Sequence, residues 1–290
     1  MSDRQSFFSR YATLTAVATF LLLIAGGLVT STDSGLAVPD WPLSYGTLFP
    51  PMVGGIVYEH THRVIAGIVG LLIAILAGWL WVKEPRRWVR RIGYLALGAV
   101  LLQAILGGLT VLLVLPAPIS VAHACLGQLI FCLMVSVALV TSSVWQRSTR
   151  LIVDHALRSD CVALTMLLFV QLCLGAIIRH SGHAVALHIG GASVLTLMIG
   201  RLLWRLMRDT TLRSSVFVRI VLGMAPGIIG QIALGMTVLR SGRQMGIATA
   251  HVALGALLLA GSCALTLLAF RAGTLLQAER STLVAKDLIA

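Results

Sequence analysis

Four histidines recur at nearly constant intervals within long apolar stretches of the chain, and imidazole is a side chain that binds metals. These histidines are His62, His123, His188 and His251. The first and third are 126 positions apart, and the second and fourth are 128 positions apart. A histidine within a hydrocarbon span is costly and usually functional. Four of them in register therefore predict ligands of a bound metal group.

The number of ligands favours heme iron over a bare metal ion. Imidazole is a common axial ligand of heme iron, and two histidines from facing helices can hold one iron. Zinc or copper would need three or four ligands at one point. Four residues after each histidine, an alanine or glycine would leave room for a flat porphyrin: Ala66, Gly127, Ala192 and Gly255. The sequence therefore predicts two heme sites, one in each half of the chain.

One carboxylate distinguishes the two predicted sites. Glu59 lies three residues before His62 and thus on the same helix face. No acid occupies the matching position before the other three histidines. A carboxylate beside one heme is a candidate catalytic group, either as a proton carrier or as an electrostatic stabiliser during oxidation at the porphyrin edge. The alternative is structural: Glu59 caps the helix or pairs with Arg63.

Arginines near the outer ends of the predicted helices are candidates for pairing with heme propionates, because guanidinium binds carboxylate well. Anchoring at the membrane interface is the alternative reading. The candidates are Arg63, Arg179, Arg240 and Arg243, and the last three are expected in outer loops.

Eight apolar segments must position these residues. Of the 290 residues, 58% are hydrophobic and 11% are charged, whereas a soluble domain carries roughly a quarter charged residues. Segments of about 20 apolar residues match the hydrocarbon core, and lipid admits such segments only as helices. The expected spans are 11–30, 63–82, 92–115, 120–144, 160–178, 185–204, 217–239 and 248–270. The predicted fold class is an all-α integral membrane protein with eight transmembrane helices.

Internal repetition predicts that these helices form two related four-helix bundles. Alternate spans end in related glycine-containing sequences, and three of them carry a glutamine four residues before the glycine: Gln103, Gln171 and Gln231. We expect these glutamines to form hydrogen bonds between helices. Both halves would run the same way through the membrane, related by a pseudo-twofold axis. The predicted division is an N-terminal half, 1–150, which contains an outer loop over 31–58, and a C-terminal half, 151–290.

The net charge of +12 indicates membrane topology and not a nucleic-acid partner. Eighteen of the 22 lysines and arginines fall on one side of the predicted membrane, which is the positive-inside asymmetry. We therefore expect both termini in the cytoplasm. All five cysteines fall within predicted helices, so no disulfide is expected.

Together these features resemble the heme A synthase family. The resemblance covers residues 11–270 and rests on the four histidines and on the segments Gly27-Leu28-Val29-Thr30, Ser34-Gly35-Leu36, Trp41-Pro42 and Glu59-x-x-His62-Arg63. It implies an oxidoreductase that converts the C8 methyl group of heme O into the formyl group of heme A by successive hydroxylations. His62 and His123 would bracket the substrate heme O beside Glu59, and His188 and His251 would hold a resident heme b. Many bacterial members carry a cysteine pair in the first outer loop; this loop has none, so the chain resembles a cysteine-free branch.

The resemblance also implies partners and a location. Heme O would be the substrate, a heme O synthase and a membrane electron acceptor would be partners, and the chain would lie in the lipid bilayer of a bacterial plasma membrane. A bis-histidine, cytochrome b-like electron carrier without heme conversion is the alternative, and a heme transporter is a third possibility. Glu59 separates the first two, because a pure electron carrier needs no carboxylate beside one heme.

Overall fold

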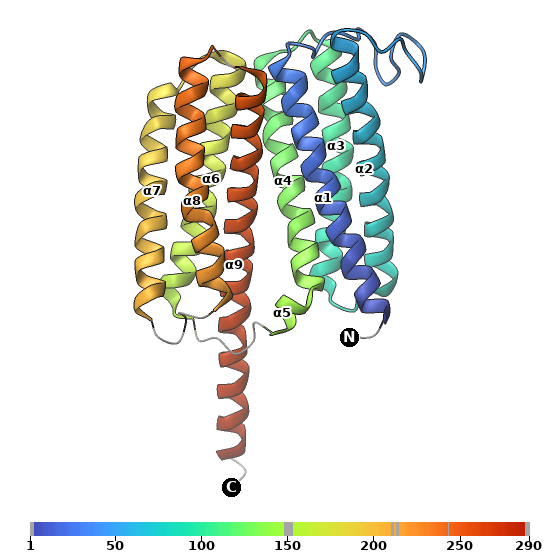
Figure 1. Cartoon of the computed structure of the whole chain (residues 1–290). Coiled ribbons are helices and arrows are strands. Elements are labelled where there is room, and N and C mark those ends of the chain that lie inside the picture. Colours follow the sequence, from blue (N-terminus) through green and yellow to red (C-terminus); the bar gives the residue numbers. More distant parts are fainter. Residues whose placement is uncertain (1–2, 148–152, 210–211, 213–214, 243, 288–290) are drawn as a thin grey trace.

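The chain folds as a bundle of long helices in the computed structural model, which describes residues 3–147, 153–209, 212, 215–242 and 244–287. Figure 1 shows these helices standing side by side, with α5 as a short turn at the lower edge. Their bounds are α1 (Asp3–Ser31), α2 (Gly55–Lys83), α3 (Arg87–Leu112), α4 (Ala117–Thr141), α5 (Ser143–Arg147), α6 (His155–Ser181), α7 (Val185–Arg208), α8 (Val216–Arg240) and α9 (Met245–Asp287).

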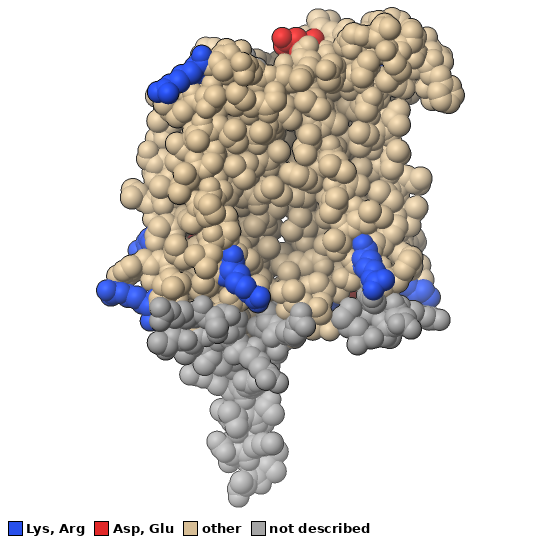
Figure 2. Space-filling model, viewed as in Figure 1, with Lys and Arg blue, Asp and Glu red and all other residues tan. Residues whose placement is uncertain are grey.

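Eight of these helices are long and apolar enough to cross a membrane, with mean hydropathies between 1.5 and 2.5. The predicted all-α membrane fold with eight spans is therefore confirmed. Figure 2 shows, on the face that it presents, basic side chains along the lower edge and at the upper left corner, and none in the band between them. Seven of these eight helices are longer than the predicted spans, because helical hydrogen bonding continues where the hydrophobic stretch has ended, whereas α4 has the predicted length and begins three residues earlier.

The long helices contact one another as two rings of four. In the first ring, α1 and α3 each contact both α2 and α4; in the second, α6 and α8 each contact both α7 and α9. The rings meet where α4 contacts α6 and α9, and where α1 contacts α9. The apolar windows of α4 and α9 are 56% and 50% buried, against 17–28% for the other spans, so these two helices form the centre of the molecule. The pseudo-twofold axis and the division at residue 150 stay predictions.

Short polar contacts join the helices at this centre. Ser31 on α1 and Thr249 on α9 lie 3.0 Å apart through their hydroxyl oxygens. The thiols of Cys125 on α4 and Cys173 on α6 lie 3.4 Å apart. All five cysteines are free, as expected. Such contacts between small polar residues are a common means of joining helices in lipid, where no hydrophobic effect drives association.

Asp154 begins α6 on the side of the bundle opposite the 32–54 loop. Its carboxylate accepts a hydrogen bond of 2.8 Å from the backbone N–H of Leu157 and forms an ion pair with Arg205 of α7. The Asp154 side chain is 62% exposed, so we expect the ion pair to contribute little. The cap is the larger of the two contributions.

Replacing Asp154 with alanine should therefore lower the free energy of unfolding by about 1 kcal/mol, the typical value of a helix N-cap. Asp154→Asn is the matched control, because it removes the charge and keeps the capping oxygen. Denaturant-dependent unfolding in detergent micelles, followed by circular dichroism, measures both. Equal destabilisation by the two variants would assign the effect to the ion pair and contradict this prediction.

Candidate heme-binding site

All four candidate histidines lie on helices of the two rings, and each imidazole packs on a glycine of the preceding helix. A Cβ atom added to these glycines would lie 3.1 to 3.3 Å from the histidine Cε1 atom. The pairs are Gly26 with His62, Gly107 with His123, Gly175 with His188, and Gly235 with His251. A side chain at any of these glycines would force the imidazole to shift. The repeated glycine near the end of alternate spans is therefore the surface on which a histidine packs, and we call it the seat of that histidine.

The histidines occupy diagonally opposite helices of each ring. His62 is on α2 and His123 on α4, while His188 is on α7 and His251 on α9. Both members of each diagonal contact the same two intervening helices, so the two histidines of a ring share its interior. The structure shows this directly for His188 and His251, whose ring centroids are 6.3 Å apart at an interplanar angle of 60°.

This spacing suits two ligands of one iron. A metal–imidazole bond of about 2 Å on each side places the two ring centres roughly 6 Å apart. In each of the four imidazoles, Cε1 is the atom nearest the glycine and Nε2 lies farther from it than Nδ1 does. In His123 and His251, Nε2 also lies 3.4 and 3.3 Å from a glutamine amide of the preceding helix. The four Nδ1 atoms are buried without a hydrogen-bond partner in the described part of the chain. Since the same nitrogen is left unpartnered at four matching positions, the four imidazoles share one environment.

A bare metal ion would need three or more ligating side chains that meet at one point of the structure. Within the described residues, no group of three or more histidine, cysteine, aspartate or glutamate side chains comes together. Zinc and copper sites usually need that many. Two histidines per ring could serve as the two axial ligands of a heme, so the residues present fit that group.

The three glutamines form interhelical hydrogen bonds, as expected. Gln103 and Gln171 donate to the backbone carbonyls of His123 and His188, and the Gln231 amide nitrogen lies 3.3 Å from Nε2 of His251.

Two of the four small residues one turn beyond the histidines pack on glutamines. Gly127 and Gly255 lie against the amides of Gln103 and Gln231. Their small size therefore admits these glutamines, and the clearance for a porphyrin stays a prediction.

Glu59 is buried in an ion pair at the outer end of α2, the end beside the 32–54 loop. The residue is 3% exposed. One carboxylate oxygen lies 2.5 Å from the Arg63 guanidinium, and the other accepts a 2.8 Å hydrogen bond from the backbone N–H of Val38. The pairing with Arg63 that was the alternative reading is thus present. Its buried position three residues before His62 also keeps this carboxylate on the histidine's side of the helix.

Arg63 joins α2 to the outer loop. Besides Glu59, its guanidinium donates to the carbonyls of Val38, Asp40 and Leu43, at 3.3, 2.7 and 2.6 Å. All of these hydrogen bonds are to groups of the protein itself. The pairing of Arg63 with a propionate stays a prediction.

The outer loop, residues 32–54, folds onto the first ring. His60, which points away from His62, binds Ser44 through a 2.8 Å contact. Hydrogen bonds from the backbone N–H groups of Gly46 and Tyr45 hold the pKa of Asp40 below its ordinary value. Figure 1 shows the loop across the upper ends of α2 and α3. The loop therefore covers the end of the ring that carries the first histidine pair.

Trp41 extends this cover from α2 to α3. Its indole ring lies so close to Gly108 that an added Cβ atom would come within 2.8 Å of it. Gly108, which follows the histidine seat Gly107, is thus needed for Trp41 of the loop to pack on α3.

The other candidate arginines are not all where the sequence placed them. Arg179 and Arg240 lie in the last turns of α6 and α8 and not in loops, because those helices continue through their polar ends. The Arg179 guanidinium donates to the Gly27 carbonyl at 3.1 Å and to the Ser31 hydroxyl at 2.7 Å, which joins the second ring to α1. Arg240 is exposed, and Arg243 lies outside the described residues.

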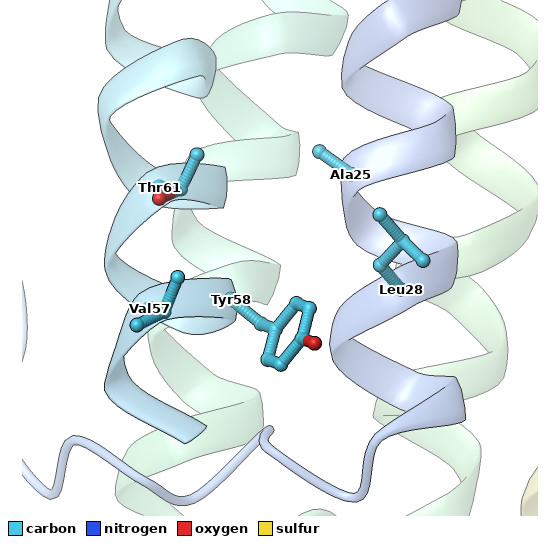
Figure 3. A pocket seen from close by; sticks show the side chains of 5 residues that line it. All are labelled: Ala25, Leu28, Val57, Tyr58 and Thr61. Carbon is cyan, nitrogen blue, oxygen red and sulfur yellow. The ribbon is translucent and has the colours of Figure 1, made fainter. Parts of the chain in front are cut away.

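Two apolar hollows lie beside α1. The smaller, of about 100 Å³, is formed by Ala25, Leu28, Val57, Tyr58 and Thr61; Figure 3 shows the Tyr58 ring reaching from α2 toward α1 beside it. The larger, of about 460 Å³, is a groove between α1 and α9. Neither is lined by a histidine.

Three known proteins that this chain is similar to share one name. A chain named heme A synthase from Exiguobacterium sp. strain AT1b is 34% identical over 191 residues, 64% of this chain and 61% of its own length. One from Bacillus licheniformis is 30% identical over 182 residues, 60% of this chain and 59% of its own. The match to one from Halalkalibacterium halodurans is 23% identical over 293 aligned positions and covers 90% of this chain and 96% of the relative.

The first two matches cover less than two thirds of those relatives. A family model described as "COX15-CtaA: Cytochrome oxidase assembly protein" matches residues 9–54 and 55–192. This range includes the outer loop, Glu59 and the first three histidine positions, and it covers more than half of the chain. The chain belongs to the COX15-CtaA family of cytochrome oxidase assembly proteins.

Proposed function

We propose that this protein is a heme A synthase, an oxidoreductase that converts the C8 methyl group of heme O into the formyl group of heme A by successive hydroxylations. The observation that carries the proposal is the asymmetry of the two rings. Each ring has two histidines on diagonal helices, and among the residues that the structure describes only the first ring has a buried carboxylate, Glu59, beside one of them. Relatives with the name heme A synthase support the same reading.

In this proposal the two rings hold different hemes. His62 and His123 bind the substrate heme O, and His188 and His251 hold a resident heme b, which supplies one-electron transfer when bound. The outer loop excludes water from the end of the first ring, since Trp41 and Arg63 fasten it to α3 and α2. Exclusion of water strengthens the electrostatic effect of nearby charges.

Glu59 is the proposed catalytic residue. A carboxylate next to the reacting porphyrin edge can accept a proton or stabilise positive charge as the methyl carbon is oxidised. The hydrogen bond from Val38 and the ion pair with Arg63 hold both of its oxygens in place. Arg63 therefore acts as a positioning residue, and the candidates for pairing with the propionates are Arg63, Arg179, Arg240 and Arg243.

The proposed setting follows from the spans and the basic residues. α1 begins and α9 ends on the same side of the bundle, the lower side in Figure 1, and the basic excess there is typical of a cytoplasmic face. The relatives are bacterial, so we place the protein in a bacterial plasma membrane with both termini inside. A heme O synthase and a membrane electron acceptor are the proposed partners.

A bis-histidine electron carrier is the second candidate, because both rings could hold a heme without converting it. Glu59 disfavours that candidate: a carrier gains nothing from a buried carboxylate beside one heme.

Co-expression with a source of heme O tests the activity. Heme A should be extracted from the purified wild-type protein, and Glu59→Gln should reduce its yield by at least roughly 100-fold, since proton transfer by a positioned side chain contributes that much. Glutamine keeps an acceptor for the Val38 N–H, so the loop should remain bound. Protoheme alone in the wild type would overturn the proposal in favour of the electron carrier, and normal heme A in Glu59→Gln would refute the role of Glu59.

Single histidine variants test the assignment of the rings. His188→Ala should abolish the b-type absorption spectrum of the second ring, because one of its two axial ligands is lost, while His62→Ala should leave that spectrum intact. Low-temperature difference spectra of the purified proteins distinguish the two. A normal bis-histidine spectrum in His188→Ala would contradict the assignment.

The glycine seats give a third test, with a control on the same helix. Gly235→Ala should displace the His251 ring, because the new Cβ would lie 3.1 Å from Cε1; overpacking of this kind costs roughly 1–3 kcal/mol. Gly223→Ala, also on α8, adds a methyl group where no atom lies within 4 Å and should have no effect. Titration of the heme-free protein with protoheme measures both affinities. Equal affinities would show that the glycine seat does not position His251.

A further inference from the structure

Three of the four histidine seats carry a glutamine from the preceding helix, and the fourth does not. The glutamine stands four residues before the seat glycine in α3, α6 and α8: Gln103, Gln171 and Gln231. At the corresponding position of α1, four residues before Gly26, the chain has Leu22. His62 is therefore the one candidate ligand whose seat lacks an amide.

Each glutamine is bound to the helix that carries its histidine. The amide nitrogen of Gln171 donates to the His188 carbonyl at 2.7 Å. That of Gln103 donates to the His123 carbonyl at 3.0 Å and lies 3.4 Å from Nε2. Because the carbonyl contact is the shorter of the two, Gln103 can keep it when Nε2 takes another partner.

The amides are built into the helix packing. Gly127, Gly191 and Gly255 lie against Gln103, Gln171 and Gln231, and a Cβ atom at any of them would crowd the glutamine. The three amide oxygens are buried without a partner in the described part of the chain. The contacts of the glutamines are therefore made by their nitrogens: those of Gln103 and Gln171 hold a backbone carbonyl of the histidine helix, and that of Gln231 lies 3.3 Å from the His251 ring.

The helix of His62 is held by contacts with the outer loop, whereas the other three histidine helices are held by a glutamine. Around it, Glu59, His60 and Arg63 bind the outer loop. A loop connected by a few polar contacts can open at less cost than a packed helix pair. The first ring thus has one histidine fixed from within the membrane, His123, and one fixed from the loop.

We propose that Gln171 and Gln231 are positioning residues that keep a heme permanently in the second ring, whereas the first ring, with Gln103 alone, is built to exchange its porphyrin through His62. The inference rests on the proposed function and deepens it. A resident cofactor must stay bound through many turnovers, while a substrate must enter and its product must leave. Partners that orient a metal ligand typically raise its affinity 10–100-fold, which is enough to separate the two behaviours.

Heme release from single-site proteins tests the proposal. The full-length protein is loaded with protoheme as either His62→Ala, which leaves the second ring, or His188→Ala, which leaves the first. Transfer of the heme to excess apomyoglobin is then followed by absorption. The second ring should release its heme at least about tenfold more slowly than the first, which is the lower limit of the effect of such partners.

Exchanging the residues between the rings should exchange the behaviour. Gln231→Leu should speed release from the second ring about tenfold. Leu22→Gln, made together with Ala66→Gly so that the new amide meets a glycine as Gln103 and Gln231 do, should slow release from the first. Slower release cannot result from misfolding, so the second variant keeps the test valid if the first variant is unstable. Gln128→Leu is the control, because it removes a buried glutamine of α4 that is not in the series, and it should change neither rate.

The outcomes separate the two proposals. Unchanged rates in both Gln231→Leu and the double variant of Leu22→Gln with Ala66→Gly, with normal protoheme binding, would overturn the role of the glutamines and leave the proposed function standing. Failure of the wild-type protein to bind protoheme in either ring would instead overturn the heme-based function itself.

Discussion

Imidazole rings inside a lipid-embedded bundle need a place where they are shielded from hydrocarbon and held at a set depth, and in this protein a glycine on the preceding helix provides it. A polar ring that faced lipid would be costly. Packing of Cε1 on a glycine brings the two helices close. The same contact occurs between α1 and α2, α3 and α4, α6 and α7, and α8 and α9. It sets which neighbours must touch in each ring and where the histidines lie along them.

The two rings then differ in what holds their ligands. In the second ring, His188 and His251 face each other across a spacing that suits a shared iron, and each is contacted by a glutamine. In the first ring, a buried ion pair between Glu59 and Arg63 connects the α2 histidine to the outer loop. A site fastened by its own helices and a site fastened by a loop are suited to different tasks, retention in one and exchange in the other.

The centre of the molecule connects these two sites. α4 and α9 carry His123 and His251 and are also the most buried helices. Arg179 extends the connection at the outer end, since it binds the Gly27 carbonyl next to the His62 seat. α1, which carries the His62 seat, is thus in contact with both α6 and α9 of the second ring.

Hydrophobic length, the spacing of the histidines and the position of Glu59 were enough to predict the helices, the number of candidate ligands and the difference between the halves, because each depends on residue type at a fixed separation along one helix. The sequence also correctly assigned the glutamine series to interhelical hydrogen bonds. Contacts between distant segments could not be predicted in this way. The loop bonds of Arg63, the approach of Arg179 to Gly27 and the packing of Gly127 and Gly255 on glutamines all depend on how neighbouring helices are rotated and how far their polar ends continue. Periodicity along a single helix carries no information on that rotation, so only the tertiary structure decided which of the predicted residues meet.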